Sequence, residues 1–102
     1  MVALGKINIT ASGTPQQLTT NPLYKGKIVI QAAEGNTHVV YVGLKNMNTS
    51  SGAQVLGVIG IPAATGQIPS YTIEIPLAPG GVSADQIYID GTTNEDVYAS
   101  IY

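Results

Sequence analysis

The chain has 102 residues, of which 44% are hydrophobic and 10% are charged, and its formal net charge is −2. This length is enough for one small domain and too short for two. The apolar content and the low charge exclude both a solvated disordered segment and a polyion. We therefore expect residues 1–102 to fold as a single domain.

The composition also argues against nucleic-acid and membrane partners. The basic residues are four lysines and no arginine, so the bidentate donor most often used to recognise phosphates and base edges is missing. No apolar run approaches the roughly 18 to 20 residues that span a bilayer, and the apolar part of the N-terminus is too short for a signal peptide. We expect a protein made in the cytoplasm that binds neither nucleic acid nor a membrane.

Two further features of the composition concern stability and surfaces. Without cysteine, the chain has no disulfide, no zinc–thiolate site and no thiol nucleophile. Its six tyrosines occur without phenylalanine or tryptophan, so every aromatic ring carries a hydroxyl that needs water or a partner. Stability must then come from the domain's own core or from neighbouring subunits, and the tyrosines suit a surface or an interface.

Short β-strands are the predicted elements. Glycine and proline interrupt the chain so often that its longest stretch without either is Thr92 to Tyr102, which is shorter than most isolated helices require. Between the interruptions lie segments rich in Val, Ile, Thr and Tyr, which favour strands. In chain order, we predict strands at residues 6–12, 16–20, 27–32, 38–43, 53–61, 71–75, 87–90 and 96–102, with one helical turn at 82–86.

These strands predict an all-β fold, a single-domain β-sandwich or jelly roll of about eight short strands. The AEGN turn at Ala33 to Asn36 predicts a hairpin that pairs the strand before it with the strand after it. Gly57 and Gly60 predict a bulge or bend in the strand that contains them. Residues 1–5 precede the first alternating segment and are expected to form a flexible arm.

Alternation along the strands also predicts the core. Side chains at every second strand position face the same side of a sheet, and burying each large aliphatic one is worth about 1.5–3 kcal/mol. The predicted core residues are Ile7, Ile9, Ile28, Ile30, Val40, Val42, Ile73, Ile75, Ile87, Ile89, Val97 and Ile101.

The sequence contains no recognisable catalytic pattern. His38 is the only histidine, no cysteine accompanies it, and no serine lies in a G-x-S-x-G context. The carboxylates of Asp90, Glu95 and Asp96 bound the turn DGTTNED, where they could hold a hard cation such as calcium. Their spacing does not match a calcium loop, and the residues are ordinary for turns, so a solvated turn is the favoured interpretation. We predict no enzyme activity, no cofactor and no metal site.

Four segments carry a family resemblance: ITASGTPQQLTT (9–20), IVIQAAEGNTHVVYVG (28–43), IPLAPGG (75–81) and IYIDGTTNEDVYASIY (87–102). Together they resemble small virion structural proteins of tailed bacteriophages, in particular the capsid decoration, or cement, type. The resemblance spans nearly the whole chain except residues 44–70. It implies a β-sandwich or jelly-roll subunit on the outside of an icosahedral head, commonly a trimer, that clamps neighbouring major capsid subunits and has no catalytic residue.

The leading expectation is therefore a decoration subunit on the capsid exterior of a virion, made in the host cytoplasm as a homotrimer that binds the major capsid protein. The alternative is a tail or head-fibre attachment module that binds a host receptor or glycan, with tyrosines of one face stacking on sugar rings. An enzyme is the third hypothesis. Expected partner contacts lie in the N-terminal arm and in two loops of low charge: Met1, Val2, Leu4, Asn46, Met47, Asn48, Ala63 and Ile68.

Overall fold

The computed structural model describes residues 2–23, 25–34, 36, 38–60 and 71–102. In this part of the chain the only helix is the 3-10 turn η1, three residues long and too short to cross a membrane. The predicted helical turn is thereby confirmed, as is the all-β class. The eight strands are β1 Val2–Asn8, β2 Gln16–Gln17, β3 Lys27–Ala32, β4 Val40–Gly43, β5 Val55–Ile59, β6 Thr72–Pro76, β7 Tyr88–Gly91 and β8 Asp96–Ile101, and η1 is Ala84–Gln86.

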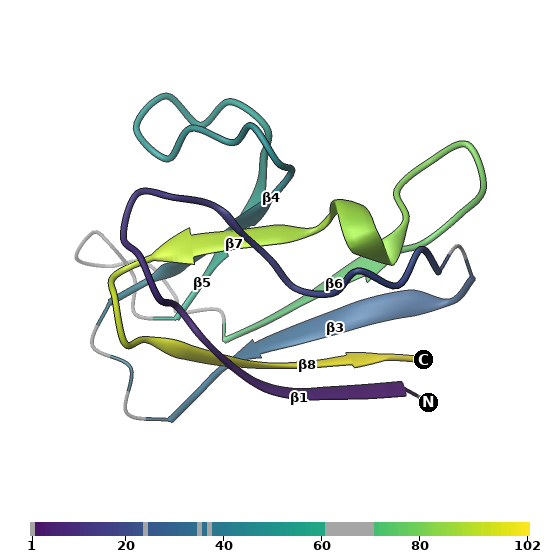
Figure 1. Ribbon diagram of the computed structural model, residues 1–102, viewed down its shortest axis with the longest axis horizontal. Helices are drawn as coiled ribbons and strands as arrows, with labels where there is room; N and C mark the ends of the chain where they lie inside the picture. Colours follow the sequence, from purple (N-terminus) through teal and green to yellow (C-terminus); the bar gives the residue numbers. More distant parts are fainter. Residues whose placement is uncertain (1, 24, 35, 37, 61–70) are drawn as a thin grey trace.

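The strands form two antiparallel sheets packed together as a β-sandwich (Figure 1). Sheet 1 has the order β1-β8-β3-β6, and sheet 2 has the order β2-β7-β4-β5. This is the arrangement of an eight-stranded jelly roll, in which the first strand pairs with the eighth, the second with the seventh, the third with the sixth and the fourth with the fifth. The two chain termini consequently lie side by side (Figure 1). The predicted fold is confirmed.

The core lies between the two sheets. Ten of the twelve predicted core side chains are buried, and the other two, Ile7 and Ile73, are partly buried and pack against the rest. On β8 the alternation is complete, since Val97, Ala99 and Ile101 are buried while Tyr98 is exposed. Strand alternation therefore predicted the burial of this domain well, because each sheet has one face toward the core and one toward solvent.

The predicted hairpin between the third and fourth strands is wrong. β3 pairs with β6 and β8 in sheet 1, whereas β4 pairs with β5 and β7 in sheet 2. Asn36 explains the difference, because its side chain donates to the carbonyl of Asp96 at 2.8 Å and accepts from the amide of Asp96 at 3.1 Å. Those bonds fasten the connection to the start of β8, so the chain crosses to the other sheet.

The first strand also differs from its prediction. Residues 2–5 lie in β1 and pair with β8, from Val2 opposite Ile101 onward, with a register shift between Ala3 and Gly5. They are thus not a free arm. A bulge explains why the segment does not look like a strand in the sequence, since one residue there is out of alternation.

Candidate interaction surface

Each sheet has two edge strands: β1 and β6 in sheet 1, and β2 and β5 in sheet 2. Among the described residues, each of the four pairs with a strand on one side only. An open edge presents backbone amides and carbonyls that can pair with another chain unless charge, proline, a bulge or shortness prevents it. The four edges differ in this respect.

Three of the edges carry such protection. β1 contains the register shift at Gly5 and the exposed Lys6. β6 carries the exposed Glu74, whose carboxylate lies 2.9 Å from the Lys27 ammonium, and its last residue is Pro76. β2 is only two residues long. These features make each of the three a poor template for a further strand.

Like β1, β5 has a bulge in the pairing with its neighbouring strand, but it carries no charged side chain and is longer than β2. Its sequence is VLGVI, without charge or proline, and the side chains of Leu56 and Val58 are 44% and 43% exposed. Val58 lies opposite the half-buried Tyr41 of β4, which extends the apolar surface onto the next strand. We call Leu56, Val58 and Tyr41 the β5 patch.

Two glycines allow close packing at and beside β5. A β-carbon at Gly57 would meet the tip of Ile73 in β6, so the missing side chain lets the edges of the two sheets approach each other. A β-carbon at Gly43 would collide with the backbone carbonyl of Gln54, which accepts the amide of Leu44 at 3.0 Å. The register shift opposite Val42 and Gly43 confirms the predicted bulge in this strand.

The expected partner contacts are not gathered at one place. Met1, Ala63 and Ile68 lie outside the described residues, and Val2 is paired in β1. Leu4 is half-buried and packs against the core. Asn46 and Asn48 are exposed in the loop between β4 and β5, as the prediction requires. Met47 in the same loop is buried, at 6% exposure, so its selection as a surface contact is wrong.

The three carboxylates of the DGTTNED turn do not form a solvated turn, so that interpretation is wrong. Asp90 and Glu95 are 4% and 7% exposed. One carboxylate oxygen of Asp90 accepts hydrogen bonds from the backbone amides of Gly13, at 3.0 Å, and Gly91, at 2.7 Å. The carboxylate of Glu95 lies 3.3 Å from the imidazole of His38.

Asp96, the third carboxylate, accepts from the amide of Asn8 at 2.8 Å and lies 3.5 Å from the Lys6 ammonium. Each carboxylate of this turn thus has protein partners of its own. No cluster of three or more metal-ligating side chains exists among the described residues. The group fastens loops at one end of the sandwich.

The tyrosines do not share one face. Tyr98 on β8 and Tyr102 just after it belong to sheet 1 and are 47% and 58% exposed. Tyr41 and Tyr88 are half-buried side chains of sheet 2, and Tyr71 precedes β6. A single tyrosine face for stacking on sugar rings, as the attachment hypothesis expects, is therefore not formed by these five residues.

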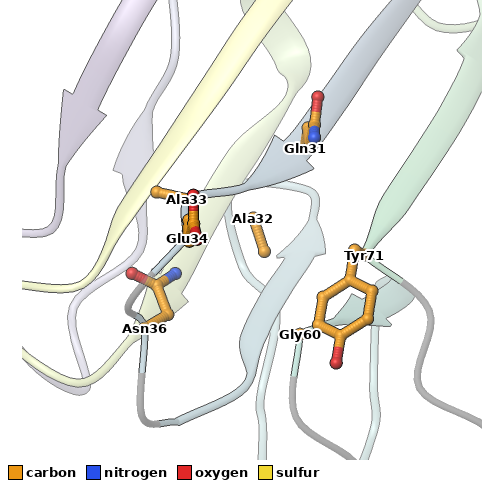
Figure 2. A pocket seen from close by; sticks show the side chains of 7 residues that line it. All are labelled: Gln31, Ala32, Ala33, Glu34, Asn36, Gly60 and Tyr71. Atoms are coloured by element: carbon orange, nitrogen blue, oxygen red, sulfur yellow. The ribbon is translucent and has the colours of Figure 1, made fainter.

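A pocket of about 450 Å³ lies where β3 ends (Figure 2). Figure 2 shows Tyr71 on one side, Glu34 and Asn36 on the other, and Ala32 between them. Among the described lining residues, only Glu34 and Tyr71 have ionisable side chains, and Asn36 is already bonded to the backbone of Asp96. Glu34 and Tyr71 lie on opposite sides of this pocket, and no hydrogen bond joins them in the described part of the chain.

No protein-family model, curated protein or solved structure matches this chain.

Proposed function

We propose that the chain is a capsid decoration protein, a structural subunit that binds the outside of a virion's major capsid shell as a homotrimer and stabilises it. The observation that carries the proposal is the β5 edge, an uncharged strand with two exposed aliphatic side chains whose backbone, among the described residues, pairs with a strand on one side only. Such an edge suits addition of a strand from a neighbouring protein, with main-chain hydrogen bonds for affinity and apolar contacts beside them.

The charge distribution supports the same use. The chain has a net charge of −2 with four lysines and six acids, so copies packed closely on a shell repel one another little. Jelly rolls recur among capsid and lectin domains, which agrees with the proposal at the level of fold alone. A decoration subunit needs no catalytic residue, because binding only the assembled shell stabilises that shell by mass action, and many contacts act together.

Electron microscopy of shells tests the proposal. The purified chain would be mixed with undecorated shells of the major capsid protein encoded in the same genome, and the occupied positions determined by averaging. We expect protrusions at every local threefold axis. Density confined to one vertex or to the tail would contradict the decoration role and favour an attachment module.

The oligomeric state is tested separately by analytical ultracentrifugation at micromolar concentration. A small core without disulfides gains stability from burying further surface between subunits, so we expect a trimer. A monomer in solution would contradict a preformed trimer while leaving the shell-binding experiment to decide the function.

A further inference from the structure

A second pocket, of about 540 Å³, lies over sheet 2. Its wall combines residues from four places in the chain: β2, β7, the loop between β4 and β5, and the turn around η1. A volume of this size is within the usual range for small-molecule sites. The side chains relevant to binding are Gln17, Lys45, Gln54, Asp85, Gln86 and Tyr88.

One side of this pocket is held rigid by internal hydrogen bonds. The side-chain amide of Gln17 donates to the carbonyl of Asp85 at 2.7 Å, which ties β2 to η1. The Ser83 hydroxyl donates to the carboxylate of Asp85, and the amide of Ser83 donates to the side-chain oxygen of Gln86 at 3.0 Å. The orientation of this wall is thus set before any ligand arrives, which lowers the entropic cost of binding.

The opposite side offers polar groups without protein partners. Within the part of the chain that the structure describes, the Lys45 ammonium, the Gln54 amide and the Tyr88 hydroxyl make no side-chain hydrogen bond. Tyr88 lies on the outward face of β7, because its neighbours Ile87 and Ile89 are fully buried. It is half-buried and its cross-strand neighbour on β4 is Gly43, which has no side chain to compete for that space.

Gln54 adds a second, independent observation. Its φ is 58°, a left-handed conformation that is strained for a residue with a β-carbon and that glycine adopts readily. Its carbonyl is fixed by the bond from the Leu44 amide, so the backbone there cannot relax without disturbing the start of β5. Strained residues of this kind concentrate at ligand sites. A glutamine where folding alone favours glycine indicates a use for its side chain.

We propose that this pocket binds a neutral saccharide. An aromatic ring at the wall can pack against the apolar face of a sugar, and the amides can both donate to and accept from its hydroxyls. Lys45 and Asp85 have opposite charges, so the pocket does not favour an anion such as a phosphate. A hydrocarbon ligand would leave the polar groups of Lys45, Gln54 and Tyr88 without hydrogen bonds, so it is disfavoured. This inference stands independently of capsid binding, because the β5 patch and the pocket use different side chains.

The test is titration of the isotope-labelled full chain with glucose, galactose and N-acetylglucosamine, followed by amide NMR shifts. We expect at least one sugar to bind in the millimolar range, with shifts confined to residues 17, 43–45, 54 and 81–88. Absence of any shift up to 100 mM sugar, or shifts located elsewhere, would overturn the proposal. Equal or larger shifts at these residues with inorganic phosphate would overturn the assignment to a neutral ligand.

Gln54→Gly separates binding from stability. It removes the amide but suits the observed backbone, so we expect binding to weaken about five- to tenfold while the melting temperature stays equal or rises. Asn94→Gly is the matched control, because Asn94 also has a positive φ, of 74°, and does not line the pocket. It should leave sugar binding unchanged.

Lys45→Ala provides a second pocket variant at an exposed loop position, where the fold does not depend on the side chain. We expect a two- to fivefold loss of sugar affinity with an unchanged melting temperature. Wild-type affinity in both pocket variants would contradict the proposed site.

Discussion

β1 and β5 are both edge strands with mainly apolar sequences, VALGKIN and VLGVI, yet they present their edges differently. A register shift interrupts the pairing of both strands, but only β1 carries a charged side chain, that of Lys6, which is 57% exposed and faces Asp96. β5 has no charge, and Leu56 and Val58 point to solvent. The comparison teaches that charge distinguishes the two edges, and that among the described residues β5 is the uncharged edge on which the proposed partner contact is best tested.

The largest expected effect is a loss of stability when a side chain is added at Gly43, beside the start of β5. In Gly43→Ala the new β-carbon would overlap the Gln54 carbonyl, which is backbone and cannot move aside cheaply. We expect the free energy of unfolding to fall by about 2–3 kcal/mol, measured by urea denaturation. Gly80→Ala is the control, since Gly80 has a φ of 77° but open space around it, and it should cost only about 1 kcal/mol. Equal losses in both variants would contradict the role assigned to Gly43.

The next effect tests the open edge itself. Val58→Lys places on β5 the kind of charge that protects β1, and we expect at least about a tenfold loss of affinity for capsid shells, because the ammonium would have to be desolvated. The free energy of unfolding should change by less than about 1 kcal/mol, since Val58 is partly exposed. Ala3→Lys, at an exposed position of β1, is the matched control and should bind as the wild type does. Loss of binding in the control alone would move the interface to sheet 1.

The fold was predictable from the sequence to the extent that it depends on local alternation. β3 has its predicted bounds, and the strict pattern of β8 gave the correct faces, because each of these strands has one side in the core. The sheet assignment of β3 and β4 was not predictable, because it depends on pairing with strands far along the chain, β6 and β8 for β3 and β7 for β4. A turn composition such as AEGN is compatible with both a hairpin and a crossing between sheets.

The candidate surface was predictable only in part. The low charge of residues 53–61 was visible in the sequence, but nothing there indicates that β5 is an edge and β3 a central strand. Met47 illustrates the reverse error, because a methionine between two asparagines looks exposed, yet it packs beside Gly43 in the folded loop. The edge position of β5 and the burial of Met47 both depend on contacts that the local sequence does not reveal.

A smaller effect is expected from removing the protection of β1. Lys6→Val makes that edge more like β5, so we expect a few-fold increase in self-association at high protein concentration, measured by light scattering. Loss of the 3.5 Å ion pair with Asp96 should lower the free energy of unfolding by less than about 1 kcal/mol, because Lys6 is mostly in solvent. Lys25→Val removes an exposed lysine outside any strand and should not increase association.

The smallest expected effect is that of salt concentration on the affinity for capsid shells. Its size distinguishes binding through an apolar edge from binding through a charged surface. The β5 patch contains no ionisable group except the Tyr41 phenol, so capsid binding through it should rely on apolar contacts and main-chain hydrogen bonds. Raising the salt concentration from 0.05 to 0.5 M would screen ion pairs but leave such contacts largely intact. We expect the affinity for shells to change by less than about twofold over this range. A fall of tenfold or more would show that charged groups elsewhere on the domain, such as the Lys6 and Lys27 side chains of sheet 1, make the contact instead.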